Sequence, residues 1–191
     1  MLHLRFMSLL ALLLGASLGA ALPRNPPASL QTCNLSKYQF LVPHKREAVL
    51  QLKKQFEDIM MLSDRTCHTL LFHRSTRKWN TAELSVPDRV MLVEAELDLA
   101  TAMLGLPTTP KFTKMRQQPL AFFTQAREDL RGCMATEAPS HQPSRKLRQW
   151  LQKLQMAMKT ETMGCLEASA ILHLFQMLND LQCAALQEEC T

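Results

Sequence analysis

Six cysteines are the residues of this chain best suited to chemistry, and their spacing limits what that chemistry is. They are Cys33, Cys67, Cys133, Cys165, Cys183 and Cys190. No two show the Cys-x-x-Cys spacing of zinc or thioredoxin-like sites, and Cys67-His68 has no second cluster in the sequence to complete a metal site. In an exported protein, the even number favours three disulfides over a metal centre.

Other potentially catalytic side chains do not form a recognisable constellation. The histidines after residue 21 are His44, His68, His73, His141 and His173. None belongs to a His-Glu-x-x-His helix, and no serine lies in a Gly-x-Ser-x-Gly elbow. We therefore expect neither a hydrolase nor any other enzyme, and no cofactor or bound metal.

The first 21 residues indicate where the protein acts. Arg5 gives a basic start, residues 6–16 are apolar apart from one serine, and Gly19-Ala20-Ala21 ends the segment with small residues. This layout predicts a secretory signal peptide at residues 1–21, which we favour over a buried N-terminal helix. Residues 22–191 would then form one extracellular domain, with an N-glycosylation sequon at Asn34-Leu35-Ser36. No stretch reaches the roughly 20 apolar residues that span a bilayer, so membrane insertion is not expected.

The net charge of +5 is mild, and one of the charges lies in the leader. Residues 74–78 and 145–148 are the densest basic segments. Neither is interleaved with aromatic residues, as a nucleic-acid surface would be, so no nucleic-acid partner is expected. Solvated loop and helix faces are favoured over contact with a glycosaminoglycan or another acidic partner.

Composition and periodicity predict an all-α fold. Five glycines and the lack of alternating Val/Ile/Thr segments argue against β-structure. After Pro43, a 3-4-3 apolar spacing predicts a first helix up to about Leu62, and residues 63–84 form a long irregular connection. The apolar stripe of this helix is Val49, Leu52, Phe56 and Ile59.

Turn and cap signals place three further helices. Residues 85–88 resemble a capping box and predict a second helix that stops before Gly105. Pro119 suits the first turn of a third helix that runs to about Met134. Ser144 would cap a fourth helix, whose apolar residues are Leu147, Trp150, Leu151, Leu154 and Met158.

A final helix is expected from Cys165 to about Leu186. On a helical wheel one broad face is apolar, whereas Ser169, His173, Gln176 and Asp180 mark the opposite face. Phe175 lies at the edge of the apolar arc and Leu172 beyond it, so a covering loop and a binding patch are both possible there. Cys165 and Cys183 return to the same outward angle. The helices together indicate a bundle with long crossover connections and no oligomerisation seam, which predicts a monomer.

Several ordered motifs resemble the type III interferons, the interferon lambdas, with the avian members most similar. They are Gly164-Cys165-Leu166-Glu167-Ala168-Ser169, Leu174-Phe175, Val93-Glu94-Ala95-Glu96-Leu97, Gln118-Pro119-Leu120 and Leu147-x-x-Trp150-Leu151-x-x-Leu154. The resemblance covers the whole chain after the leader. It implies a class II helical cytokine bundle with disulfides Cys33–Cys133, Cys67–Cys165 and Cys183–Cys190.

The resemblance also implies cytokine signalling through a two-chain receptor. A lambda-specific receptor chain would meet the first helix, the loop after it and the last helix; interleukin-10 receptor subunit beta would meet a side that includes the helix near Pro119. The positions that match receptor contacts are Pro43, Arg46, Val49, Leu172, Phe175 and Gln176. Leu172, Arg46 and Gln176 differ from the residue types usual in the family, which suggests receptor specificity tuned to its own lineage.

Two alternatives remain open. Twelve methionines favour weakly a secreted carrier that holds an apolar ligand inside the bundle, although flexible Met more often fills a core. A type I interferon-like cytokine would share the fold, but its Cys-Ala-Trp-Glu helix start is absent.

Overall fold

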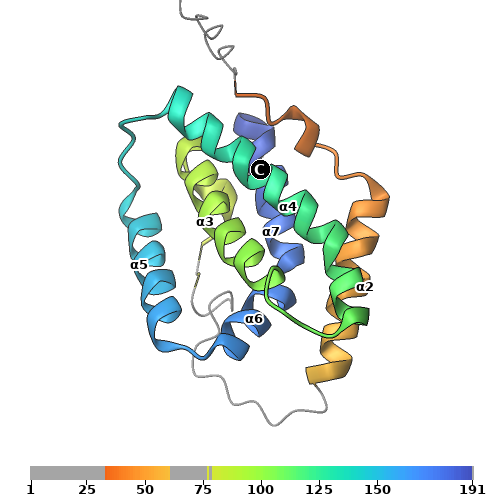
Figure 1. Cartoon of the computed structure of the whole chain (residues 1–191). Coiled ribbons are helices and arrows are strands. Elements are labelled where there is room, and N and C mark those ends of the chain that lie inside the picture. The colour runs from red at the N-terminus through yellow and green to blue at the C-terminus, as the bar shows by residue number, and fades with distance from the viewer. Residues whose placement is uncertain (1–32, 61–76, 78, 191) are drawn as a thin grey trace, which may run out of the picture. The chain divides into compact units, whose positions relative to one another are not determined.

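Helices form the regular structure of the chain in the computed structural model, which describes residues 33–60, 77 and 79–190 (Figure 1). The α-helices in this part are α2 (Pro43–Met60), α3 (Val86–Leu104), α4 (Pro110–Glu137), α5 (Arg145–Thr160), α6 (Met163–Leu172) and α7 (Leu174–Leu186). Three short 3-10 helices flank them: η1 (Ser36–Tyr38), η2 (Thr81–Glu83) and η3 (Gln187–Glu189). The described residues therefore form the all-helical fold that the sequence predicts. The predicted leader and Cys67 lie outside the described residues.

Helix α3 is the centre of the bundle. It packs against α4, α5, α6 and α7, whereas α2 packs on α4, α6 and α7 (Figure 1). Leu92, Val93, Leu97 and Leu99 are fully buried although they point in different directions around α3. A helix that is apolar nearly all round belongs in the interior. Helix α5 packs chiefly on α3, at the side of the bundle away from α2.

The expected capping box at residues 85–88 is wrong. The Ser85 side chain makes no cap, and Asp88 is buried and turned toward the start of α5. Its carboxylate accepts the backbone N–H of Ser144 at 3.2 Å and contacts His141 Nε2 at 2.9 Å. Ser144 does cap α5 as expected, because its hydroxyl accepts the N–H of Leu147. Local spacing predicted that the Asp88 carboxylate would cap α3, but it bonds instead to residues that are distant in the sequence.

The third expected helix starts earlier than Pro119 suggested. Pro110 occupies the first turn of α4, the position that proline favours, and Pro119 lies inside the helix. An internal proline removes one backbone hydrogen bond, so packing of the added turns must offset that loss. Phe112 stacks on Phe56, with ring centroids 6.0 Å apart, and the buried Arg116 donates to the carbonyls of Met103 and Leu106.

Two expected inward residues are exposed instead. Ile59 lies near the end of α2 and Met158 near the end of α5, where the stripe of each helix leaves the core. Elsewhere the stripes pack as expected, with Leu52, Leu147 and Leu154 all buried.

Disulfides fasten both ends of the described chain. Cys33–Cys133 joins the segment before α2 to α4, and Cys183–Cys190 closes the C-terminal turn of α7. Cys165 is also disulfide-bonded, and its expected partner Cys67 lies outside the described residues. In the described part of the chain, no helix is long and apolar enough to cross a membrane. No three potential metal-ligating side chains gather among those same residues.

The two described disulfides should differ in their contribution to stability. Cys33–Cys133 encloses 100 residues and Cys183–Cys190 only 7. Loop-closure entropy then gives about 4.7 kcal/mol for the long bridge and about 2.4 kcal/mol for the short one. We predict that Cys33→Ala/Cys133→Ala lowers the free energy of unfolding in urea by more than Cys183→Ala/Cys190→Ala. The reverse order would show that chain entropy does not govern the stabilisation by these bridges.

Candidate functional site

The positions on α2 that match receptor contacts fall into two environments. Pro43 and Arg46 are exposed on the first turns of the helix. Val49 is only 1% exposed and lies in the core. This burial removes Val49 from the candidate surface. Its apolar spacing with Leu52 and Phe56 had already indicated that it belongs to the buried stripe.

The segment that precedes α2 is held against α7 by reciprocal hydrogen bonds. Gln39 Nε2 donates to the carbonyl of Ala185 at 3.1 Å, and Gln182 Nε2 donates to the carbonyl of Gln39 at 2.7 Å. Both contacts are in the C-terminal half of α7, and α2 also packs on α6. The two helices therefore run in opposite directions, and α2 faces both parts of the C-terminal helical segment.

The expected last helix is wrong in its continuity, because it breaks at His173. The His173 N–H bonds to the carbonyl of Ala170 instead of following the α-helical pattern, and φ/ψ there are −105°/8°. The imidazole Nδ1 lies 2.8 Å from the carbonyl oxygen of Ser169, which a continuous helix would bond through the His173 backbone. A carbonyl can only accept, so Nδ1 carries the proton. The side chain thus replaces a lost backbone bond.

This break changes the wheel on which the last-helix predictions rested. Leu172, Phe175 and Gln176 flank the break, and each is partly exposed. Leu172 and Phe175 also pack against the hydrophobic core. Phe175 is therefore neither a wholly surface residue nor a core residue, and its outer part is available to a partner.

The supposed polar face of the last helix is largely buried. Ser169 and Asp180 are both nearly inaccessible. Asp180 accepts two hydrogen bonds from Arg77, at 2.9 and 3.1 Å, and a third from the Thr81 hydroxyl. Arg77 also bonds to Glu96 on α3 at 2.8 Å. We call Arg77, Glu96 and Asp180 the buried ionic cluster, and it fixes α7 to α3 and to the chain before η2.

Glu96 is the unusual member of this cluster. It is fully buried, and one of its carboxylate oxygens has no hydrogen-bond partner among the described residues. Burial raises the pKa of Glu96 well above 4.5, and the nearby Asp180 carboxylate raises it further, while Arg77 opposes both effects. One guanidinium cannot neutralise two carboxylates, so a proton on Glu96 leaves the cluster uncharged.

Sequence reasoning missed three exposed apolar residues beside the α2 positions. Phe40 is 80% exposed, and Val42 and Leu50 are about half exposed. Leu50 lies four residues after Arg46 and seven after Pro43, so all three share one face of α2. The available signal was that Leu50 falls outside the stripe of Val49, Leu52 and Phe56. We call Pro43, Arg46 and Leu50 the α2 outer face; Phe40 lies just before this helix, next to Gln39.

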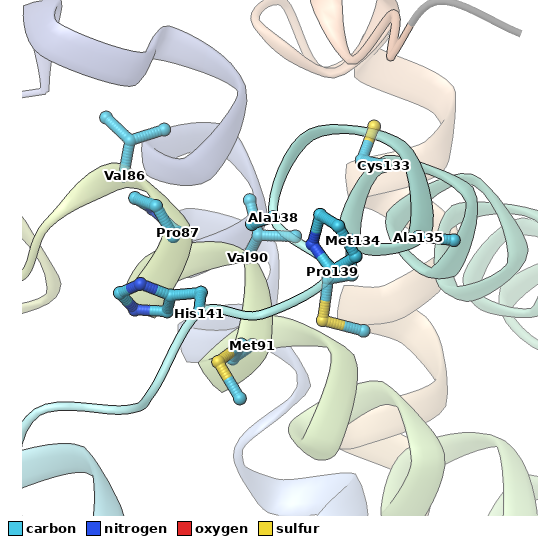
Figure 2. Close-up of a pocket in the computed structure, with 10 residues that line it drawn as sticks. All are labelled: Val86, Pro87, Val90, Met91, Cys133, Met134, Ala135, Ala138, Pro139 and His141. Carbon is cyan, nitrogen blue, oxygen red and sulfur yellow. The ribbon is translucent and has the colours of Figure 1, made fainter.

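A cavity of about 670 Å³ lies between the start of α3 and the end of α4, and it includes no residue of α2, α6 or α7 (Figure 2). The residues that line it are Val86, Pro87, Val90, Met91, Cys133, Met134, Ala135, Ala138, Pro139 and His141. Most of this lining is apolar, and its one titratable ring is the imidazole of His141, whose Nε2 faces Asp88. Such a cavity can hold an apolar group, but it lies at one end of the helices and not inside the bundle, where the carrier hypothesis placed its ligand.

The sequon residue Asn34 is exposed next to the Cys33–Cys133 bridge. Its side-chain oxygen accepts hydrogen bonds from the N–H and hydroxyl of Ser36. Glycosylation at Asn34 stays a prediction, and the exposed amide is compatible with it.

Comparisons with known proteins agree on one family. The family model described as Interleukin-28A matches residues 30–187. Interferon lambda-3 of Gallus gallus is 61% identical over 178 residues, which cover 93% of each chain. Interferon lambda-2 of Mus musculus is 31% identical over 86% of this chain and 85% of its own, and interferon lambda-1 of Homo sapiens is 28% identical over 89% and 84%.

The raised pKa of Glu96 leads to a testable pH dependence. The folded protein holds a proton that the unfolded chain releases above about pH 4.5, so this group's contribution to stability falls as the pH rises past that value. A glutamine at this position cannot ionise. We therefore predict that Glu96→Gln loses less unfolding free energy between about pH 5 and pH 7 than the natural chain does.

Urea unfolding at each pH measures this difference. Glu94→Gln is the matched control, since Glu94 lies on the same helix but pairs with Arg131 at the surface, at 2.7 Å. Parallel pH profiles for the natural chain and Glu96→Gln would contradict a protonated Glu96.

Proposed function

The chain belongs to the interferon lambda family, and from that premise we propose that it signals by joining a lambda-specific receptor chain to interleukin-10 receptor subunit beta. It is a cytokine and not an enzyme. We further propose that residues 1–21 are removed as a signal peptide and that the remaining domain acts outside cells. Interferon lambda cytokines are secreted proteins, which supports this location.

The observation that carries the receptor proposal is the pairing of two partly apolar surfaces on adjacent helices. The α2 outer face carries Leu50, Phe40 is exposed just before this helix, and the α6–α7 break presents Leu172 and Phe175. Helix α2 packs on both α6 and α7, so one partner can meet both surfaces. Aromatic anchors surrounded by smaller contacts are typical of binding hot spots. We assign this combined surface to the lambda-specific chain.

Rigidity supports the same assignment. The reciprocal Gln39 and Gln182 contacts fix the segment just before α2, and the buried ionic cluster fixes α7 against α3. A surface held in its binding conformation loses little side-chain and backbone entropy when a partner binds. Gln176 and Arg46 supply polar groups next to the apolar residues, where they can select the receptor.

The shared receptor chain is assigned to α4. This helix packs on both α2 and α3, so its outward residues form a surface separate from the α2 outer face. Among them Gln117, Gln118, Ala121 and Gln125 are exposed. Two receptor chains bound to neighbouring helices would be held at high effective concentration, which is sufficient for receptor-bound Janus kinases to act on each other. The kinases would then phosphorylate STAT factors and start antiviral transcription.

The cavity of Figure 2 favours, as a second candidate, a carrier of an apolar ligand. Organic extraction of the purified protein distinguishes the two functions. A stoichiometric lipid in the extract, together with no receptor-dependent signal, would favour the carrier.

Phe175→Ala should weaken binding to the lambda-specific chain about thirtyfold or more, the equivalent of about 2 kcal/mol for an aromatic anchor. Because Phe175 also packs on the core, the variant should lose some thermal stability. Leu151→Ala is the control, since Leu151 is likewise partly buried and core-packed but lies on α5. Surface plasmon resonance and thermal unfolding measure both effects. Equal loss of binding in both variants would assign the effect to stability alone.

The function itself is tested by STAT phosphorylation in epithelial cells of the same species. We expect the signal to disappear when either receptor chain is deleted, because each chain brings a kinase that cannot act alone. Full activity without the lambda-specific chain would indicate type I interferon behaviour.

A further inference from the structure

Helix α5 carries an excess of positive charge that matches that of the whole protein. Its sixteen residues contain five basic side chains and no acidic one: Arg145, Lys146, Arg148, Lys153 and Lys159. The formal net charge of the chain is also +5, so basic and acidic side chains balance over the rest of the sequence. Among the described helices, none other has so large an excess of basic over acidic side chains.

All five basic side chains are exposed, and they occupy one face. At 100° per residue they fall within an arc of roughly 160°, and the first and last are about 21 Å apart along the axis. The opposite face, formed by Leu147, Trp150, Leu154 and Ala157, is buried against the bundle. We call the five exposed side chains the α5 basic face.

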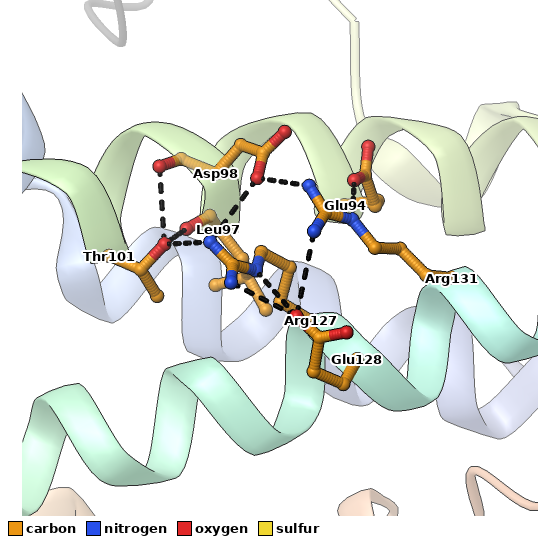
Figure 3. A network of polar contacts seen from close by, with 7 residues as sticks. All are labelled: Glu94, Leu97, Asp98, Thr101, Arg127, Glu128 and Arg131. Carbon is orange, nitrogen blue, oxygen red and sulfur yellow. Dashed lines mark hydrogen bonds and ion pairs between the residues drawn. The ribbon is translucent and has the colours of Figure 1, made fainter.

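Most of the α5 basic face lacks counterions, in contrast to the arginines of α4 that face α3. Among the described side chains, only Lys146 of the five has an ion pair, with Glu83 at 2.9 Å, where both groups are about half exposed. On α4, by comparison, Arg127 and Arg131 are enclosed by Glu94, Asp98 and Glu128 (Figure 3). The α3–α4 surface is thus neutralised internally, whereas the α5 surface is open to an external anion.

The position of these charges also opposes helix stability. Three of them lie in the first turn of α5, at the positive end of the helix dipole, and no acidic residue accompanies them. Each such placement destabilises the helix, because like charges meet at its positive end. The buried Asp88 carboxylate, which accepts the Ser144 N–H at the start of α5, offsets part of this destabilisation. A local rule broken at several neighbouring positions is expected where function requires it.

We propose that the α5 basic face binds a sulfated glycosaminoglycan of the cell surface or matrix. The occupant follows from charge complementarity, because a linear polyanion can meet cations spread along a helix. Insertion into an anionic membrane fits less well, because the apolar face of α5 is already buried. Single-stranded nucleic acid fits less well too, because the exposed face offers no aromatic side chain for base stacking.

This second partner does not compete with the proposed receptors. Helix α5 packs chiefly on α3, and Figure 1 shows it on the other side of the bundle from α2. The inference rests on the extracellular location in the proposed function, but not on the assignment of receptor surfaces. Glycosaminoglycan capture would hold the cytokine near the cells that release it while leaving α2, α6 and α7 accessible.

The test is binding of residues 22–191 to immobilised heparin across a series of NaCl concentrations. We expect Arg145→Gln/Lys153→Gln to weaken binding about tenfold at physiological salt and to make the salt dependence shallower by the loss of about two ionic contacts. Lys111→Gln/Lys114→Gln is the matched control: it removes the same charge from exposed positions at the start of α4. This control should keep binding within about twofold of the natural chain.

Three results would overturn the proposal. They are no heparin binding by the natural domain at low salt, equal loss in the two double variants, and binding to phosphatidylserine vesicles but not to heparin. Receptor binding of the Arg145→Gln/Lys153→Gln variant is measured in parallel and should be unchanged. That readout separates failure of the glycosaminoglycan site from failure of the cytokine function.

Discussion

Arg77 bonds to carboxylates from two different helices, Glu96 on α3 and Asp180 on α7, and all three side chains are nearly buried. Two buried acids that share one base would repel each other if both were ionised, and the raised pKa of Glu96 relieves this repulsion. Such a cluster adds little net stability, because desolvation opposes the attraction between charges. Its directional bonds instead permit only one position of α7 relative to α3. The α6–α7 surface depends on that position.

Local signals predicted the helices well and their ends less well. The first three members of the α2 stripe, the Ser144 cap and the stop of α3 near Gly105 all follow from the sequence. Pro119, Asp88 and His173 behave otherwise, and in each case the deciding group is distant or is a side chain that replaces the backbone. The buried contacts of Arg116 and Phe112 stabilise the turns of α4 that precede Pro119. The Asp88 carboxylate bonds to residues at the start of α5, and the His173 ring bonds to the Ser169 carbonyl. Apolar periodicity in the sequence cannot predict such bonds between distant residues or between a side chain and the backbone.

The candidate site shows the same limit. Pro43 and Arg46 could be placed on the surface from spacing, and Val49 should have been placed in the core by the same rule. Phe175 could not be placed, because its angle on the wheel assumed an unbroken helix. Phe40 lies before α2, where helical periodicity predicts nothing. The structure shows that its neighbour Gln39 is hydrogen-bonded to α7, which holds this segment in place.

Charge and apolar surface are separated in this fold, and the separation follows from which helices need neighbours. Helix α2 buries one stripe against three helices and still carries apolar residues outward, which is costly in water unless a partner covers them. Helix α5 buries its whole apolar face on the bundle and keeps only polar and cationic groups outside, apart from isolated methionines. Because α3 lies between these helices, a polyanion on α5 and an apolar partner on α2 would bind to separate surfaces. A cytokine arranged in this way can be retained near a cell by charge and recognised by its receptor through shape.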